Sequence, residues 1–478
     1  HYGKVTLREK FPEKNYRLLP DLPGATPHLS LGYSVINPLW VTSKLQELKR
    51  RGEEAKAVSP KRALRPKGEE LLELLPPSGD LWKGTVYPAG EGDNWFASGS
   101  ASYWRILSSL PSEPQAACAS LTNIFQELNA RLLSVFAREG TLAALKTQRG
   151  YDGYKYYQIP RIRGTVLLHQ MRLRLGNDLF LKVMKSIHET FREKPATTAQ
   201  ILALAESVAK RSLKDLFTAW LEREDLPSLR VEAVKREEGN RWRVEGTLRQ
   251  EQPGEAYPLK TFLAVETEEG LSLFAVEGDE KQIPFSFTTS SKPLSVEAHW
   301  SSPLPVNNPR FPTLNYLIEE FHDALLVYGT SRQIEANHTL GLRFQTTLAD
   351  SFSETFIPLV KDGEVDEEEL KNHDLILLGG PQDNGLTARV LPDLNLEAGP
   401  GLFRWKGELF AKPDQGLFVA LPSPFNPKKT VYLYLANSAM ELYQMTKRFQ
   451  NLPSWALFQG ETATEKGYFT PPECKVSL

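Results

Sequence analysis

The spacing of apolar residues changes twice along this chain of 478 residues. Up to Pro227 they recur at helical intervals, as in the series Leu168, Met171 and Leu175. After Pro227 they alternate with polar residues in short segments, and from about residue 304 continuous apolar runs alternate with stretches compatible with helices. Because each spacing suits a different kind of packing, we predict a multidomain α+β protein with domains at 1–227, 228–303 and 304–478.

The first region carries start signals for its last helices. Thr197 and Thr198 are suited to cap a helix, and Ser212 is suited to cap the next one. An apolar stripe of Phe217, Trp220 and their neighbours follows, which is typical of a buried helix face. We therefore expect this region to be mostly helical, with a long helix starting at Gly164.

The second region has the alternation and the turn residues of a small β-sandwich. The strands are expected at 229–234, 241–246, 259–265, 271–276, 283–287 and 294–298.

The third region is predicted to contain an open α/β sheet. The buried strands are expected at 325–328, 355–360 and 375–378, with a later strand pair at 417–421 and 430–435 and a helix at 439–449.

Ligands of open α/β sheets bind beyond the carboxyl ends of the strands. The candidate ligand loops here contain Gly329 and Thr330 after the first strand, and Gly379, Gly380 and Asn384 after the other. Neither loop has the glycine pattern of a dinucleotide site or a P-loop, so no nucleotide is predicted. The alternative is that both loops are tight strand–helix turns.

The segment WFASGSASY at Trp95–Tyr103 and the helical stretch from Tyr151 to Arg230 resemble the zinc aminopeptidases of the aminopeptidase N type, the gluzincin group. The resemblance is strongest around Gly164, the Thr197–Thr198 cap and the Phe217-to-Leu221 stretch. It implies a thermolysin-like, mostly helical peptidase domain, followed by a small β-sandwich and a C-terminal α/β domain.

The zinc site of that family needs H-E-x-x-H on one helix, with a Glu base, and a second Glu as third ligand. Aligned without gaps, this chain has Leu75, Pro76, Gly79 and Ser98 at the four positions. Pro76 is also expected to end the metal helix, since an interior proline costs roughly 3 kcal/mol.

Other functional positions of the family are changed as well. The resemblance places Arg161 where the transition-state tyrosine stands, and Tyr156 matches a second tyrosine present in some members. Ile36 replaces the glutamate that holds the substrate amine. Tyr156 and Arg161 are the candidate cleft-binding residues, because a phenol and a guanidinium can still bind a peptide and its carboxylate.

The family's N-terminal β domain has no counterpart in this sequence. We expect His1 to follow a segment that has been removed or that exists as a separate chain. The strand expected at Tyr2–Glu9 would then offer an open edge to that fragment or to an assembly subunit.

Composition limits the partners. The net charge of −2 comes from balanced acids and bases, so no nucleic-acid partner is predicted. No apolar run reaches the ~20 residues that span a bilayer, so an integral membrane chain is not predicted. Cys118 and Cys474 form either one disulfide or two free thiols, and the eight scattered histidines predict no metal site.

We therefore predict a non-catalytic aminopeptidase-like protein, a pseudoenzyme with neither metal nor cofactor, that binds protein or peptide as a scaffold. One alternative is an active zinc metallo-aminopeptidase with displaced ligands, or one completed by a missing chain. A second alternative is a structural subunit of an extracellular or envelope assembly. An extracellular or envelope location is expected in preference to the cytoplasm.

Overall fold

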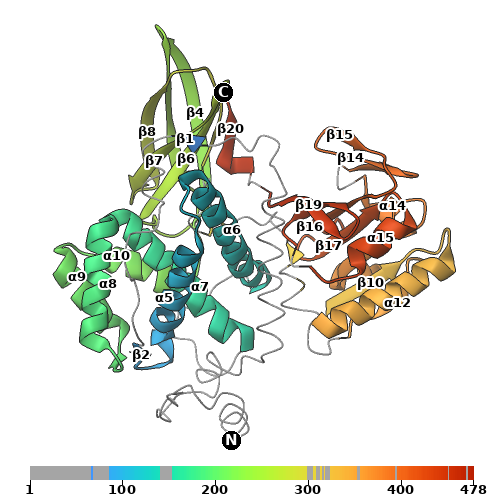
Figure 1. The fold of residues 1–478 in the computed structure, drawn as a ribbon, viewed down its shortest axis with the longest axis horizontal. Helices are drawn as coiled ribbons and strands as arrows, with labels where there is room; N and C mark the ends of the chain where they lie inside the picture. The colour runs from blue at the N-terminus through green and yellow to red at the C-terminus, as the bar shows by residue number, and fades with distance from the viewer. Residues whose placement is uncertain are drawn as a thin grey trace, which may run out of the picture. The chain divides into compact units, whose positions relative to one another are not determined.

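A computed structural model describes residues 66–67, 86–139, 153–298, 305–307, 313–314, 317, 323–351, 356–392, 396–450, 452–469 and 472–478. All of them belong to one compact unit, Leu64–Leu478. The fold is mixed α+β, with a helical region and several β-sheets (Figure 1). The predictions for Tyr2–Glu9, Ile36, Leu75, Pro76 and Gly79 lie outside the described residues.

The helical region contains a short parallel pairing of β2 (Tyr87–Pro88), which precedes its first helix, with β3 (Pro195–Ala196), which lies between two later helices. Its helices bury apolar residues at helical spacing, as Phe180, Val183 and Ile187 do on α8. The elements are η1 (Glu91–Asp93), α5 (Asn94–Ser109), α6 (Pro114–Glu139), α7 (Gly153–Leu175), α8 (Asn177–Phe191), α9 (Thr198–Ala209), α10 (Lys214–Phe217) and η3 (Thr218–Glu222).

Two helix starts differ from prediction and one agrees. Thr197 caps α9 through a reciprocal capping box with Gln200, as its sequence indicated. Helix α7 begins at Gly153, ahead of the expected Gly164, because buried Ile159 extends its apolar face through Pro160. The N-cap position of α10 is Leu213, one residue after the predicted Ser212, although the Ser212 hydroxyl accepts from the Lys214 amide of the helix at 3.4 Å.

Two sheets form the β-region and contribute to one buried core with the helices. The six predicted strands are all present, most of them longer than expected. One sheet has the order β4 (Leu229–Glu238), β5 (Arg241–Gln250), β8 (Gln282–Thr289). The other has the order β1 (Pro66–Lys67), β7 (Gly270–Gly278), β6 (Leu259–Thr267), β9 (Pro293–Glu297), β20 (Lys475–Ser477).

Strand β20 was not predicted. It comes from the C-terminal end of the sequence, after all the strands of the α/β sheet, and pairs antiparallel with β9. The preceding turn, η5 (Pro472–Cys474), places the buried Cys474 thiol against the Leu229 carbonyl of β4. Cys474 and Cys118 are both free and buried, so the two-thiol alternative is correct.

The third region contains a seven-stranded sheet. Its first four strands are parallel to one another and the last three are antiparallel to their neighbours. The order is β11 (Leu359–Lys361), β10 (Ala324–Tyr328), β12 (Asp374–Leu378), β17 (Thr430–Ala436), β16 (Gln415–Pro422), β18 (Trp455–Gln459), β19 (Thr462–Gly467).

Successive residues of each strand point to opposite faces of this sheet. Leu326, Ile376 and Tyr432 pack under α12 (Ile334–Ser351) and α15 (Ala439–Thr446). Neighbours such as Val327 and Leu377 pack on the other face, which is covered by α13 (Glu367–Asn372), α14 (Gly385–Val390) and the small sheet β13 (Glu397–Gly399), β14 (Leu402–Trp405), β15 (Glu408–Phe410). Figure 1 draws this region in orange and red.

Two predicted elements of this region are shorter than expected. The strand at 355–360 is reduced to β11, which starts at Leu359, and the helix expected to reach Phe449 ends at Thr446. Helix ends are weakly determined by apolar spacing alone, which explains the second difference. No helix in the described ranges is long and apolar enough to cross a bilayer.

Candidate functional site

Helices α5 and α7 touch through their backbones. A methyl group on Gly99 would lie 2.8 Å from the Gly164 Cα, and one on Gly164 would collide with the Trp95 carbonyl oxygen. The Thr165 hydroxyl donates to the Gly99 carbonyl across the same contact, at 3.4 Å. A side chain at either glycine would meet the backbone of the other helix, so these two helices form a fixed pair.

Ser98 and Arg161 lie on this helix pair. The Ser98 hydroxyl donates to the Asn94 carbonyl one turn back on α5, at 2.8 Å. The Arg161 carbonyl accepts from Thr165 on α7, and its side chain is partly buried. Tyr156 lies near the start of α7, but its side chain is outside the described residues, as are Leu75, Pro76 and Gly79.

A buried polar cluster connects α5 to α7. The Tyr103 hydroxyl lies 3.0 Å from His169 Nδ1 and accepts a hydrogen bond of 3.0 Å from Arg172 Nη1. Burial, followed by the charge of Arg172, holds the pKa of His169 well below its usual range. His169 is therefore neutral at physiological pH. Within the described ranges, no three His, Cys, Asp or Glu side chains gather as a metal site requires.

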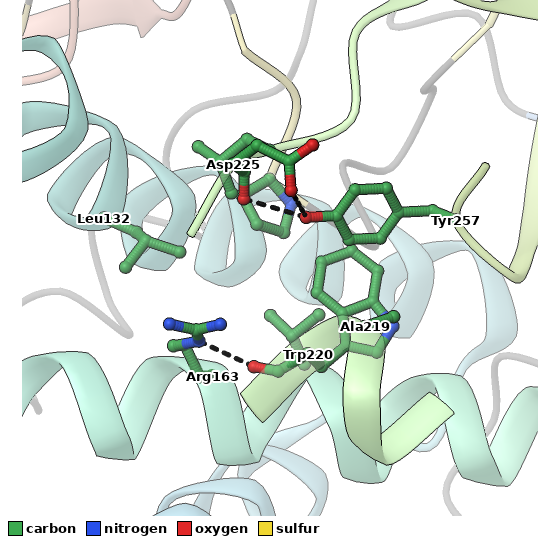
Figure 2. Close-up of a pocket in the computed structure, with 9 residues that line it drawn as sticks. Leu132, Arg163, Ala219, Trp220, Asp225 and Tyr257 are labelled. Carbon is green, nitrogen blue, oxygen red and sulfur yellow. Dashed lines mark hydrogen bonds between the residues drawn. The ribbon is translucent and has the colours of Figure 1, made fainter. Parts of the chain in front are cut away.

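A small cavity lies between the helices, the segment before β4 and the loop between β5 and β6 (Figure 2). Its volume of about 10 Å³ corresponds to roughly one water molecule. It is lined by Leu132, Arg163, Val166, Ala219, Trp220, Asp225, Leu226, Tyr257 and Pro305. A cavity of this size does not accommodate a peptide side chain, so its importance lies in the groups around it.

Arg163 holds the end of the last helical turn. Its side chain is buried on α7, and it donates from Nε to the Trp220 carbonyl at 2.6 Å and from Nη2 to the Arg223 carbonyl. Burial lowers the pKa of Arg163 to about 10, against the opposing charges of Tyr257, Asp225 and Glu224. The guanidinium thus stays charged and satisfies carbonyls that a helix end leaves unpaired.

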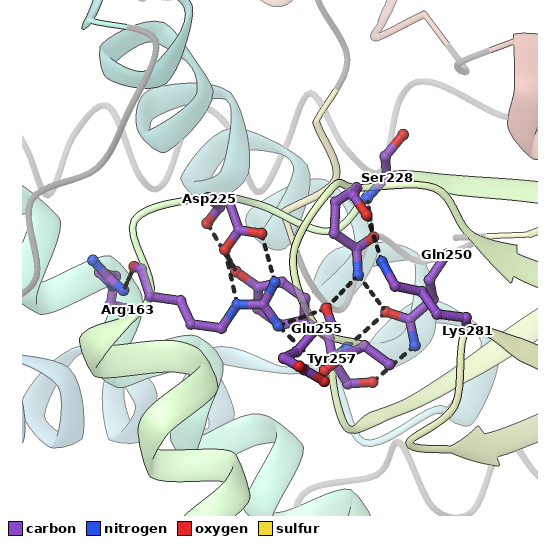
Figure 3. Close-up of polar contacts among 10 residues, drawn as sticks. Arg163, Asp225, Ser228, Gln250, Glu255, Tyr257 and Lys281 are labelled. Atoms are coloured by element: carbon purple, nitrogen blue, oxygen red, sulfur yellow. Dashed lines mark hydrogen bonds and ion pairs between the residues drawn. The ribbon is translucent and has the colours of Figure 1, made fainter.

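The network continues toward the β-region through Arg223 and through Asp225 and Tyr257, which Figure 3 labels. Arg223 forms a bidentate pair with Asp225, with contacts of 2.8 and 2.5 Å, and its guanidinium lies 3.8 Å from the ring centroid of Tyr257. The Tyr257 hydroxyl donates to Asp225, with the backbone oxygen at 2.8 Å and Oδ1 at 3.0 Å. Burial raises the pKa of Asp225, but the bonds from Arg223 outweigh this effect and the net shift is downward.

Two glutamines fix the loop that carries Tyr257. Gln250 accepts from the Tyr257 backbone at 2.8 Å and donates to its carbonyl at 2.9 Å. Gln252 donates to Gln250 and accepts from the Ser228 backbone. The network therefore joins the last turn of the helical region to the loop between β5 and β6, and its geometry is that of a structural joint.

The sequence did not predict this joint. Its partners are far apart in the chain, with Arg163 separated by 60 residues from the Arg223 carbonyl. The one local signal is the pair Arg223 and Asp225 shortly before Pro227.

The structure brings the predicted α/β loops together at one edge of the sheet. Asn384 is fully buried and donates to the Val327 carbonyl of β10 and the Leu378 carbonyl of β12, at 3.3 and 3.1 Å. Its Oδ1 accepts from the Leu386 and Thr387 amides in the first turn of α14. Asn384 thus links two parallel strands and caps a helix.

Asp362 connects the loop after β10 to the start of α14 at the same edge. It accepts from the Thr330 hydroxyl at 2.6 Å and from the Gly385 amide at 2.6 Å. A methyl group on Gly329 would collide with the Asp383 backbone, and Gly379 has a φ of +99°. Gly380 accepts from the Asp383 and Asn384 amides. These contacts describe tightly packed turns, and ligand binding by the loops stays a prediction.

No protein-family model matches the sequence, and no curated protein matches it. Among solved structures, the chain is similar to Legionella pneumophila aminopeptidase A in complex with aspartic acid, with 11% identity, a TM-score of 0.33, and coverage of 57% of this chain and 30% of that chain. It is also similar to a mutant M1 zinc metallopeptidase from Deinococcus radiodurans bound to Tyr-Ser-Ala, with 24% identity, a TM-score of 0.24, and coverage of 30% of each chain.

The chain therefore spans about 30% of the length of both structures. These are distant structural resemblances to zinc aminopeptidases, and neither assigns the chain to that family.

Proposed function

We propose that this chain is a non-catalytic relative of the aminopeptidase N-type enzymes, a pseudopeptidase that serves as a binding or assembly scaffold for protein or peptide. The proposal includes a thermolysin-like arrangement of the helical region. The observation that carries it is Ser98, a neutral side chain hydrogen-bonded to its own helix at the position where the resemblance requires a zinc-binding carboxylate.

Ligand chemistry supports this proposal. Zinc in peptidases is held by imidazole nitrogens and carboxylate oxygens, whereas a serine hydroxyl is neutral at physiological pH. The Ser98 side chain is also too short to extend beyond its helix as a glutamate does. With Leu75, Pro76 and Gly79 at the other three positions, the sequence offers neither a ligand nor a base in the family's pattern.

Arg161 supports the proposal that the chain still binds peptides. The resemblance places it where a tyrosine stabilises the oxyanion of the transition state. A guanidinium there can form charge-assisted hydrogen bonds with a carboxylate, such as that of a bound peptide. Binding without turnover is therefore the chemistry that we assign to the helix pair α5 and α7.

Catalysis is tested by incubating the full chain with a peptide mixture and zinc, with and without a chelator. We expect the peptides to be recovered intact, because ligands and base are missing, and mass spectrometry of released amino acids measures this. An active aminopeptidase of the same type is the positive control. Amino-acid release that stops on chelation would contradict the proposal.

Binding is tested with the same peptides by gel filtration. We expect intact peptides to elute with the protein, and Arg161→Ala to reduce their retention. Arg192→Ala, an exposed position at the end of α8, is the matched control and should leave retention unchanged. Equal retention by the two variants would remove Arg161 from the proposed binding surface.

A further inference from the structure

Glu441 is a buried acid in the first turn of α15. The residue is 2% exposed, although glutamates are almost never fully buried unless they are paired. Its Oε2 accepts one hydrogen bond, from the Gly460 amide at 3.0 Å. Its Oε1 is buried without a hydrogen-bond partner among the residues that the structure describes. A single hydrogen-bond donor therefore contacts a carboxyl group that is buried away from solvent.

The carboxyl group does not cap its own helix. Ser438 performs that function, since its hydroxyl accepts from the Glu441 backbone amide at 3.1 Å. The Glu441 side chain instead reaches the turn between β18 and β19, where Gly460 has a φ of +62°. This side chain thus links α15 to the turn that starts the edge strand β19, beside the contacts that Glu461 of the turn makes with Lys447 and Gln450.

Charged groups lie on three segments next to α15, and Asp414 is the one whose charge acts on Glu441. Asp414, in the segment before β16, accepts from Gln459 at 2.7 Å. Glu461, in the turn itself, is paired with Lys447 and Arg448 at the end of α15. On α12, Arg343 lies over the Tyr443 ring, at 5.1 Å.

These surroundings favour the neutral acid. Burial raises the pKa of Glu441 to about 7, the Gly460 amide opposes this shift, and the Asp414 charge adds to it. The cost of burying the charge exceeds the benefit of one hydrogen bond to it.

We propose that Glu441 is a proton-operated latch, which as the neutral acid holds the β18–β19 turn against α15 and as the buried carboxylate releases it. The inference is independent of the proposed pseudopeptidase function. It concerns only α15, the end of β18 and the turn into β19.

The direction of the pH dependence follows from the difference between the pKa of Glu441 in the closed turn and in the open turn. In the open turn the carboxyl group is in water and returns to its ordinary pKa of 4.5, whereas in the closed turn its pKa is about 7. The closed form therefore binds more protons between these values, and opening becomes easier as the pH rises through that window. From about pH 5 to about pH 8 the population of the open turn should increase on the order of 50-fold.

The test is hydrogen–deuterium exchange of the full chain, with rates at Gly460 to Thr462 divided by the intrinsic rates at each pH. We expect protection in the wild type to fall by on the order of 50-fold from about pH 5 to about pH 8. Glu441→Gln should show constant protection, because the amide is neutral at every pH. Glu465→Gln, an exposed position on β19, should keep the wild-type response.

Two results would overturn the latch. One is a wild-type protection that does not change with pH, and the other is an unchanged pH response in Glu441→Gln. If that variant does not fold, carbon NMR of the wild-type carboxyl group decides the question. A titration midpoint near 7 supports the latch, and one near the ordinary 4.5 overturns it.

Discussion

At the scale of single residues, the stability of the helix pair depends on polar groups that have no access to water. Tyr103, His169 and Arg172 are each at most 2% exposed and interact through the Tyr103 hydroxyl. Burial raises the pKa of Tyr103, and the nearby Arg172 opposes the shift. The hydroxyl therefore stays protonated and can serve both neighbours.

Tyr103→Phe is expected to destabilise the protein by about 1–3 kcal/mol, because it removes a partner from two buried polar groups. Urea unfolding of the full chain measures the change. Tyr443→Phe, at a half-buried ring on α15, is the control and should stay within ~0.5 kcal/mol of wild type. Equal stability of Tyr103→Phe and the control would show that the cluster is not structurally important.

At the scale of elements, α5 and α7 cross so closely that the helical turn of α5 that contains Ser98 lies directly beside the backbone of α7. Gly99→Ala should separate these helices, because the added methyl group would meet the Gly164 backbone. We expect a loss of about 1–3 kcal/mol, measured by thermal unfolding.

Gly363→Ala is the control for that experiment. A methyl group there meets no atom within 4 Å, and its backbone has no positive φ. If the two alanine variants unfold at the same temperature, the close approach of α5 and α7 is not required for stability.

The joint between η3 and the loop after β5 should respond to acid. Arg223 lowers the pKa of Asp225 below its ordinary 3.8, so the pair contributes stability above that value and loses it as the pH falls further. Asp225→Asn should therefore be less stable than wild type at neutral pH, and the difference should shrink below about pH 4. Unfolding midpoints measured across this range would contradict the assignment if the difference did not depend on pH.

Elements with strong local patterns could be predicted from sequence, and those that depend on distant partners could not. The apolar runs of β10 and β12, the alternation of β4 to β9 and the Thr197 cap are local signals, and each was confirmed. The three-residue strand β20 has no pattern of its own, because β9 determines its pairing. The Arg163 contacts were missed for the same reason, since both acceptors lie more than 50 residues away.

At the scale of the whole molecule, the last residues return to the β-region after the α/β sheet is complete. Strand β20 pairs with β9, and Lys235 of β4 donates to the Leu478 carbonyl at 2.9 Å. Cys474 lies at this return, and burial raises its pKa to about 12. Burial also raises the pKa of Cys118, on α6, to about 12.

Both thiols should therefore resist a thiolate-specific reagent in the native protein and react fully after unfolding. Labelling followed by mass spectrometry distinguishes the two positions. Fast labelling of Cys474 alone would show that η5 and β20 detach from the β-region. This result would contradict the stable pairing of β20 with β9.

We propose that Ser98 on α5 occupies the position of a zinc ligand but does not bind zinc. Zinc content of the full chain, measured after exposure to excess zinc and gel filtration, tests this most directly. We predict no stoichiometric zinc, and no gain in Ser98→Glu, because one carboxylate does not replace the two missing histidines. One chelator-removable zinc per wild-type chain would contradict the claim.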